Sequence, residues 1–185
     1  MPDITLISGP CGCGKTTFAD VYAKHLAFTQ GKTVCVIHGD DFHGCFVEPE
    51  ARGELFKDGR AADPPAWEEI LSFNWDCILF TAQRALRMNA DAVIDYVVED
   101  ELPRVRELAK SAGARLYYIV LTADEEEIKA RIRRRGDTGL TERALFLKKE
   151  LEAMPENRGH IYDNTRKTPE DMIAGIDPEQ FRVVL

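Results

Sequence analysis

Short apolar runs alternate along this chain with longer stretches in which apolar residues recur at helical spacing. The first four runs are dense in Val and Ile without polar alternation, as expected of strands that are buried on both faces of a sheet. The alternation of strands and helices predicts an α/β fold built on a parallel five-stranded sheet. The predicted strands are Ile4–Ser8, Thr33–His38, Ala92–Val97, Arg115–Leu121 and His160–Tyr162, with Arg182–Leu185 as an extra edge strand.

Capping residues, Pro and Gly mark where the helices begin and end. Pro near the first helical position and Gly just past the last one are preferred helix boundaries. The polar, glycine-flanked break Gly136–Gly139 separates two helices and is typical of a segment that moves as a lid, about residues 136–140. The predicted helices are Thr17–Leu26, Asp63-Pro64 to about Met88, Pro103 to Gly113, Thr122 or Asp124 to Arg135, Thr141 to about Ala153, and a short one from Thr168-Pro169.

Length and composition favour one globular domain over residues 1–185. The hydrophobic fraction of 44% is ordinary for such a domain, and no apolar run approaches the roughly 20 residues that a membrane helix needs. The net charge of −8 is unfavourable for sequence-independent binding to nucleic acid, which depends on neutralising phosphates. We therefore expect neither a nucleic-acid nor a membrane partner. The expected oligomeric state is a monomer or a homodimer.

The five cysteines are an odd number at irregular spacing. This pattern favours free thiols in a reducing cytoplasm over a disulfide framework. The N-terminal Met1-Pro2-Asp3 has neither the basic nor the apolar segment of a secretory signal. Both observations predict a cytoplasmic protein.

The most informative segment is Gly9–Thr17, which matches G-x-x-x-x-G-K-[ST] at every fixed position. It joins the first predicted strand to the first predicted helix, which is the context that a phosphate-binding loop (P-loop) requires. The glycines let backbone N–H groups wrap around a polyphosphate, and the helix N-terminus adds its partial positive charge. Lys15 would reach the β- and γ-phosphates, and the Thr16 hydroxyl would bind Mg²⁺. The segment predicts ATP and Mg²⁺ as cofactors, with the nucleotide held by Gly9, Cys11, Gly12, Cys13, Gly14, Lys15, Thr16 and Thr17.

Carboxylates lie at the ends of the second and third strands, the edge where open parallel sheets bind ligands. Asp40 is the candidate that orients an acceptor hydroxyl and accepts its proton. Asp41 is the alternative, because neighbours on an extended segment point to opposite sides. Asp95 is the candidate ligand of Mg²⁺, directly or through water. A turn and helix cap would also explain Gly39-Asp40-Asp41, since Asp is favoured there.

Arginines gather on the helix before the predicted lid, where Arg131 and Arg135 are four residues apart and share one helix face. Guanidinium groups suit both stacking on an adenine ring and binding the oxygens of a transferring phosphate. The alternative is a solvated basic helix end, which the helix dipole favours.

The chain has, in order, a strand, the P-loop, a second strand followed by Gly39-Asp40, a third strand with Asp95, and an arginine-rich helix before a lid. This order resembles that of the small P-loop kinases, which include gluconate kinase, shikimate kinase and chloramphenicol phosphotransferase. The likeness covers nearly the whole chain, and to gluconate-kinase-like proteins it rests on Asp63–Glu68, Val93–Tyr96 and Tyr162–Thr165. It implies a three-layer P-loop NTPase fold, the fold of the nucleoside-monophosphate kinases. The strand order would be 2-3-1-4-5, with helices on both faces and with ATP and Mg²⁺ at the carboxyl end of the sheet.

The resemblance also implies residue roles. Arg131 would pack on adenine, and Arg135 would reach the transferred phosphate. The segment from Asn164-Thr165 through Lys167-Thr168 would line the adenine pocket. Shikimate kinases place two acids one residue apart after the second strand, whereas Asp40 and Asp41 are adjacent, and the gluconate kinase lid pattern is absent. The acceptor therefore does not follow from the resemblance.

The predicted acceptor-binding segment, about residues 42–75, contains Arg52 and Arg60, which suit an anionic group on the acceptor. Its aromatic residues would suit stacking on a base or a sugar face. The helical spacing of Trp67, Phe73 and Trp75 favours core positions instead.

Two positions of the glycine-rich loop are thiols, Cys11 and Cys13. A thiol at a helix N-terminus can have a lowered pKa, which gives the hypothesis that its modification blocks ATP binding. The simpler interpretation is that two small side chains fill variable positions of the loop.

The leading prediction is an ATP-dependent kinase that acts on a hydroxyl of a small-molecule acceptor. Lys15, Asp40 and Arg135 would be its catalytic residues, and Asp41, Arg52 and Arg60 would bind the substrate. A nucleoside or nucleotide acceptor is the alternative within the same class. A regulatory ATPase is the alternative from another class, although no tail, coiled coil or partner-binding tract supports it.

Overall fold

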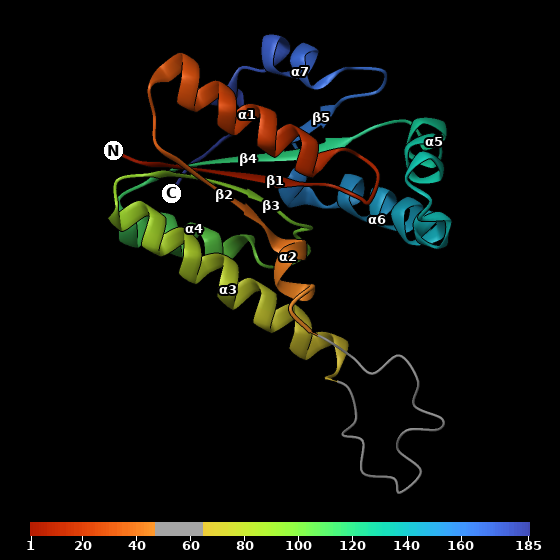
Figure 1. The fold of residues 1–185 in the computed structure, drawn as a ribbon, viewed down its shortest axis with the longest axis horizontal. Helices are drawn as coiled ribbons and strands as arrows, with labels where there is room; N and C mark the ends of the chain where they lie inside the picture. Colours follow the sequence, from red (N-terminus) through yellow and green to blue (C-terminus); the bar gives the residue numbers. More distant parts are fainter. Residues whose placement is uncertain (47–64) are drawn as a thin grey trace, which may run out of the picture.

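A parallel sheet forms the middle layer of the computed structural model, which describes residues 1–46 and 65–185 (Figure 1). The strand order is β2-β3-β1-β4-β5, as the resemblance implied. The short β6 (Arg182–Val183) pairs antiparallel with the start of β4, whereas β5 pairs with the end of β4, so the predicted extra strand is present. The parallel strands are β1 (Asp3–Ser8), β2 (Val34–His38), β3 (Asp91–Asp95), β4 (Arg115–Thr122) and β5 (Ile161–Asp163).

Helices cover both faces of the sheet, which confirms the predicted three layers. Figure 1 shows α1 and α7 over one face and α3 and α4 over the other, with α2, α5 and α6 toward the carboxyl ends of the strands. Among the described helices, none is long and apolar enough to cross a membrane. Their bounds are α1 (Lys15–Gln30), α2 (Gly39–His43), α3 (Trp67–Arg87), α4 (Leu102–Ala112), α5 (Glu125–Arg135), α6 (Thr141–Ala153) and α7 (Pro169–Gly175), with 3-10 turns at Thr138–Leu140, Pro155–Asn157 and Pro178–Phe181.

The predicted helices are present, but α1 is longer than predicted, Lys15–Gln30 rather than Thr17–Leu26. Two further helix starts are corrected. Helix α3 begins at Trp67, where the Glu69 carboxylate accepts the N–H of Ala66, so the start predicted at Asp63-Pro64 is wrong. Asp63 and Pro64 themselves, like Arg52 and Arg60, lie outside the described residues.

The second correction concerns Thr141, which is the first residue of α6 and donates its hydroxyl to the Thr138 carbonyl instead of capping the helix. Of the two caps considered for α5, Asp124 is the one observed, and it accepts the N–H of Glu127.

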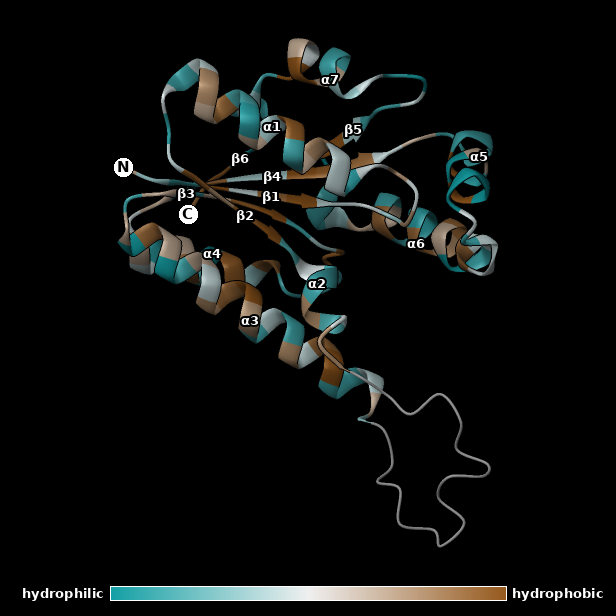
Figure 2. Cartoon of the chain, in the orientation of Figure 1, coloured by the Kyte–Doolittle hydropathy of each residue, from teal (hydrophilic) through white to brown (hydrophobic). Residues whose placement is uncertain are grey.

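Apolar side chains fill both interfaces between the sheet and its helices. Figure 2 shows hydrophobic residues (brown) along the strands and hydrophilic residues (teal) over most of α5. Trp75 is buried between α3 and the sheet, as its spacing predicts. Trp67 and Phe73 are 48% and 40% exposed, so the prediction that they are core residues is wrong. Trp67 shares a helix face with the buried Ile70, but it lies in the first turn of α3, where its ring contacts His43, and the Phe73 ring contacts Phe46. Helical spacing alone does not say how much of the helix the sheet covers.

A cluster of charged side chains links the amino ends of three central strands. The carboxylate of Asp3 (β1) accepts hydrogen bonds from Arg115 (β4) at 2.7 and 2.8 Å and from Lys32 at 2.8 Å. The same ammonium lies 2.7 Å from Asp91 (β3), which in turn accepts the backbone N–H of Asp3. Burial alone would raise the pKa of Asp3, but the hydrogen bonds from Arg115 and Lys32 outweigh it and lower that pKa.

Replacing Asp3 by Asn should remove part of the acid sensitivity of the fold. Because the folded pKa lies below the unfolded value, the carboxylate stabilises the protein above about pH 4, and this stabilisation is lost as the pH falls through the folded pKa. Asp3→Asn should lower the free energy of unfolding by about 2 kcal/mol at neutral pH. Below pH 4 it should lose less further stability than wild type, as measured by urea unfolding at several pH values. The exposed Asp100→Asn control should keep the wild-type pH dependence. If Asp3→Asn loses as much stability below pH 4 as wild type does, the stabilising role of the Asp3 carboxylate is contradicted.

Candidate active site

The glycine-rich loop leaves β1 at Ser8 and enters α1 at Lys15. Gly9, Gly12 and Gly14 have φ angles of 140°, 77° and 93°, which disfavour any residue with a side chain. A Cβ at Gly9 would lie 2.3 Å from the carbonyl oxygen of Leu121 in β4. The glycines therefore let the loop curl tightly while it lies against the sheet.

Two side chains hold this loop through the carbonyl group of Cys13. Asn164, which follows β5, donates its Nδ2 to this oxygen at 2.7 Å, and Arg131 of α5 donates at 3.0 Å. The Arg131 guanidinium also donates to both oxygens of Asn164 and to Glu127. The loop is thus fixed by α5 and by the segment after β5, although all three are far apart in the sequence.

Lys15 is buried and lies across the loop. Its ammonium donates to the carbonyl oxygens of Gly9 at 2.9 Å and Pro10 at 3.2 Å. The positive charge is therefore held next to the backbone N–H groups at the start of α1, where a polyphosphate would be bound.

Asp95, at the end of β3, is the centre of a second polar group. Its carboxylate is 3% exposed, accepts the Thr16 hydroxyl at 2.7 Å on Oδ2 and contacts His38 Nδ1 through Oδ1. The other imidazole nitrogen of His38 lies 3.4 Å from Asp20.

The pKa values of this pair both shift upward. Burial raises the pKa of Asp95, against the opposing hydrogen bonds from Thr16 and His38. Burial alone would lower the pKa of His38, but the hydrogen bond to Asp95 and the charges of Asp95 and Asp20 outweigh it and raise that pKa. The contact with Asp95 therefore favours the protonated form of the His38 imidazole.

Thr16 and Asp95 fit a magnesium ion. Because the Thr16 hydroxyl donates its proton to Asp95, its lone pairs are left for a cation, and Mg²⁺ prefers such oxygen ligands. Within residues 1–46 and 65–185, no group of three or more His, Cys, Asp or Glu side chains is arranged to hold a metal ion. The remaining ligands would therefore come from the nucleotide and water, as is usual for Mg²⁺.

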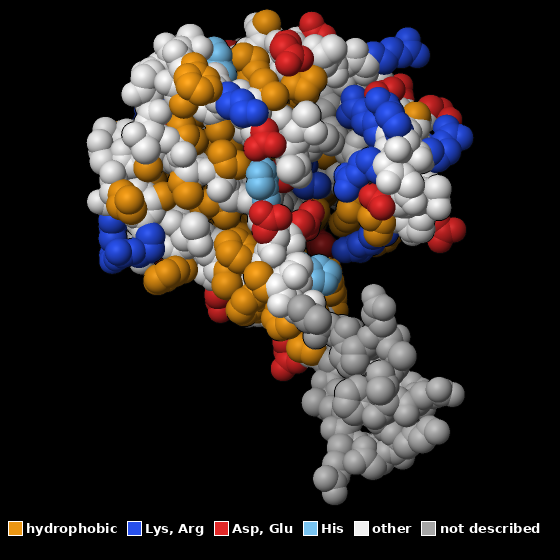
Figure 3. Space-filling model, in the orientation of Figure 1, with side chains coloured by type: hydrophobic (Ala, Val, Ile, Leu, Met, Phe, Trp, Pro, Cys, Tyr) orange, Lys and Arg blue, Asp and Glu red, His pale blue; other side chains and the backbone are white. Residues whose placement is uncertain are grey.

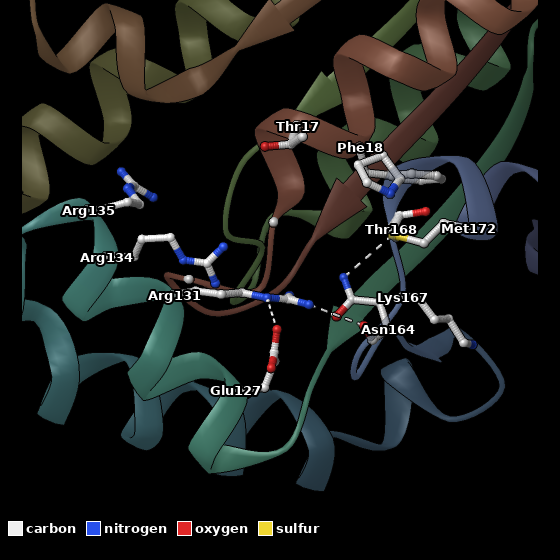
Figure 4. A pocket seen from close by; sticks show the side chains of 13 residues that line it. Thr17, Phe18, Glu127, Arg131, Arg134, Arg135, Asn164, Lys167, Thr168 and Met172 are labelled. Carbon is white, nitrogen blue, oxygen red and sulfur yellow. Dashed lines mark hydrogen bonds and ion pairs between the residues drawn. The ribbon is translucent and has the colours of Figure 1, made fainter.

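A cavity of about 420 Å³ opens beside the loop, between α1, α5 and the segment that joins β5 to α7 (Figure 4). Four basic residues and one acidic residue line it, and the acidic one, Glu127, is paired with Arg131. Figure 3 shows basic side chains gathered over α5 and acidic ones across a hollow toward α2. The cavity lining consists of Gly12, Gly14, Thr17, Phe18, Glu127, Arg131, Arg134, Arg135, Asn164, Lys167, Thr168, Pro169 and Met172.

The sequence matches a family model described as an AAA domain, over residues 4–160. This match covers most of the chain and includes the glycine-rich loop. The chain belongs to this AAA-domain family. Among curated protein sequences, none matches it significantly.

Solved structures share the fold of this AAA-domain protein at low sequence identity. A candidate kinase from Chloroflexus aurantiacus has a TM-score of 0.59 and 17% identity, over 96% of this chain and 93% of that one. A sugar kinase from Janibacter sp. HTCC2649 has a TM-score of 0.58 and 17% identity, over 94% and 91%. A gluconokinase from Sinorhizobium meliloti 1021 has a TM-score of 0.55 and 17% identity, over 97% and 90%. The resemblance to small P-loop kinases is thereby confirmed for the fold.

The AAA-domain chain brings most of the predicted donor-side residues to one place. Arg131 and Arg135 both line the cavity, Arg131 largely enclosed by its hydrogen bonds and Arg135 67% exposed beside Asp137. Lys167 also lines the cavity and donates to the carbonyl oxygen of Asp163. Thr165 does not line it, because its hydroxyl joins Asp163 to the backbone N–H of Asp124.

Asp40 and Asp41 lie in the first turn of α2 rather than on an extended segment, which corrects the geometry expected for them. Both are exposed beyond the end of β2, next to the strand that carries Asp95. The short helix turns their side chains in different directions, so the choice between them remains a prediction.

The two loop thiols differ in their surroundings. Cys13 is fully buried in the core beneath α1, and burial raises the pKa of its thiol, so the lowered pKa expected at a helix N-terminus is not found there. Cys11 is partly buried against Ile128 and Ile132 of α5. All five cysteines are free, as predicted.

Two residues of the site make contacts that the sequence-based prediction does not include. The sequence marks His38 only as the end of the second strand, and the resemblance places Asn164 only in the segment that lines the adenine pocket. The signal for His38 was its position as the last residue of β2, level with Asp95 in the register of β3. Asn164 carried no comparable signal, because its partner Cys13 is 151 residues away.

Replacing Asn164 by Ala should weaken nucleotide binding, because the Cys13 carbonyl and Arg131 would each lose a partner. We expect about a tenfold higher dissociation constant for ATP, since the loss of a hydrogen bond in such a network costs about 1–2 kcal/mol. Calorimetric titration with ATP would measure it. The matched control is Asn157→Ala, which removes an equally buried amide that bonds Tyr118 and the Leu151 carbonyl, remote from the loop. The control should lose stability but keep its ATP affinity, and equal affinities in the two variants would refute the role of Asn164.

Proposed function

We propose that this chain is an ATP-dependent kinase that transfers the γ-phosphate of ATP to a hydroxyl of a small-molecule acceptor. The observation that carries this proposal is the contact between Thr16 and Asp95 at the start of α1, 2.7 Å long and directly after the loop lysine. The pairing of a loop hydroxyl with a buried carboxylate suits a Mg²⁺–nucleotide complex. The kinases among the structures with this fold support the same class of reaction.

The donor phosphates would be bound by backbone hydrogen-bond donors and by positively charged side chains. Backbone N–H groups of the loop and the Lys15 ammonium would bind the β- and γ-phosphates. Mg²⁺, when bound, would neutralise charge on their oxygens. Arg135 and Arg134 reach the same cavity from α5. Arg135 is 67% exposed and lies 3.3 Å from Asp137, and in this proposal it would turn from Asp137 toward the transferring phosphate. In this proposal Arg131 has a double role, holding the loop and lining the place of the adenine.

The acceptor would approach from the side of α2. Asp40 would orient the acceptor hydroxyl and accept its proton as the hydroxyl oxygen bonds to the γ-phosphorus. The bond between this phosphorus and the β–γ bridging oxygen breaks, and ADP leaves with the electron pair. The exposure of Asp40 beside the end of β3 supports this role.

A nucleoside or nucleotide acceptor is a second candidate, favoured by the aromatic side chains beside α2. Trp67 lies edge-on to His43 at 5.2 Å between ring centroids, and Phe73 lies edge-on to Phe46 at 5.0 Å. Exposed rings of this kind suit stacking on a base. An anionic acceptor group would be bound by Arg52 and Arg60 in this proposal.

Lys15→Ala should abolish phosphoryl transfer while the fold is kept. We expect kcat to fall by at least about a thousandfold, because the charge that stabilises the transferring phosphate is lost. ADP release would be followed across a panel of sugars, polyols, nucleosides and nucleotides. Lys24→Ala, an exposed lysine of the same helix, should retain wild-type activity. Full activity in Lys15→Ala would refute the mechanism. If no acceptor in the panel changes the rate of ADP release by wild type, a regulatory ATPase would be favoured.

Asp40→Asn and Asp41→Asn should separate the two candidate bases. Loss of the general base should lower kcat by about 100-fold or more with the best acceptor, and leave the affinity for ATP unchanged. We expect this result for Asp40→Asn, and less than a threefold change in kcat for Asp41→Asn. The reverse pattern would assign the base to Asp41.

A further inference from the structure

We propose that His38 is a positioning residue that orients the Asp95 carboxylate for the Mg²⁺–nucleotide complex. This inference rests on the proposed function, because it assigns Asp95 to the magnesium site. The side chain of His38 itself would touch neither the nucleotide nor the acceptor.

The register of the sheet places His38 directly beside Asp95. β2 and β3 run parallel, and their last residues, His38 and Asp95, are paired across the two strands. The imidazole Nδ1 lies against Asp95 Oδ1, while Oδ2 accepts the Thr16 hydroxyl. Each carboxylate oxygen therefore has its own donor, and the two donors fix the rotation of the carboxylate plane.

The far side of the imidazole has an acidic neighbour as well. Its Nε2 lies 3.4 Å from Asp20, which is one helical turn after Thr16 on α1. Thr16, Asp95, His38 and Asp20 thus form a closed ring that begins and ends on the same helix. The ring ties the ends of β2 and β3 to the helix that follows the phosphate-binding loop.

The backbone at this point allows His38 little freedom. The next residue, Gly39, is buried against Tyr96, and a Cβ on Gly39 would lie 2.4 Å from the Tyr96 ring. This close approach holds the turn between β2 and α2 against the end of β3. The fold therefore places the backbone of His38 beside Asp95 independently of the hydrogen bond between their side chains.

Removal of the imidazole would leave Asp95 Oδ1 buried without this donor. The carboxylate could then rotate away from Thr16, and the oxygens that face the metal would be displaced. Residues that orient metal-binding groups in this way typically change metal affinity about 10- to 100-fold when they are replaced. The expected defect is thus a loss of the contribution of Mg²⁺ to nucleotide binding.

The test measures the affinity for the fluorescent nucleotide mant-ATP with excess Mg²⁺ and with EDTA. In wild type, Mg²⁺ should tighten binding, and His38→Ala should reduce this tightening about tenfold while affinity in EDTA stays unchanged. His38→Asn should restore it, because the Asn amide nitrogen takes the place of imidazole Nδ1. His25→Ala, on the outer side of α1, is the matched control and should behave as wild type.

The outcomes separate the two levels of the proposal. If Mg²⁺ tightens binding equally in wild type and His38→Ala, the positioning role is overturned and the proposed kinase is not. If Mg²⁺ does not affect mant-ATP binding in wild type, the proposed function fails and this inference fails with it. Should His38→Ala not fold, His38→Gln replaces it, since Gln reaches the Nε2 position toward Asp20 rather than Asp95. The Asn variant should then keep the tightening and the Gln variant should lose it, and equal behaviour of the two would overturn the role.

Discussion

The candidate site is organised around the buried carboxylate of Asp95. A carboxylate that is 3% exposed is costly to keep charged unless hydrogen bonds replace the water that it loses. Thr16 and His38 supply those bonds, one from the helix after the loop and one from the neighbouring strand. Because β3 lies between β1 and β2, its end is where these two donors meet. The Asp95 carboxylate thus links the first turn of α1 to the turn between β2 and α2.

On the other side of the loop, the carbonyl group of Cys13 has a comparable role. It accepts hydrogen bonds from Asn164 and Arg131, while the apolar face of α5 packs against Gly12 through Ile132. Helix α5 thus touches the loop with both apolar and charged side chains. The same helix carries Arg135 at its C-terminus, directly before the predicted lid. A displacement of α5 would therefore move the loop together with Arg135, the arginine proposed to bind phosphate.

The two ends of the sheet have opposite properties. At the amino end, Asp3, Lys32, Asp91 and Arg115 pair with one another and leave little unneutralised charge. At the carboxyl end, basic side chains surround a cavity in a chain whose net charge is −8. Such local separation of charge would attract an anionic ligand to one edge of an otherwise acidic protein. The charged cluster at the amino end joins the central strands, and the carboxyl end holds the candidate active site.

The sequence by itself determined the strands, the loop and the spacing of Arg131 and Arg135, because each depends on residues that are close together in the chain. A strand is visible as an apolar run, and the loop glycines are required by a local backbone conformation. Only the tertiary structure decided that His38 meets Asp95, that Asn164 holds Cys13, and that Trp67 is exposed at the start of α3. The first two depend on which elements become neighbours across 57 and 151 residues of sequence, and the third on how much of α3 the sheet covers. Local periodicity records how a side chain projects from its own element, but not which distant element packs against it.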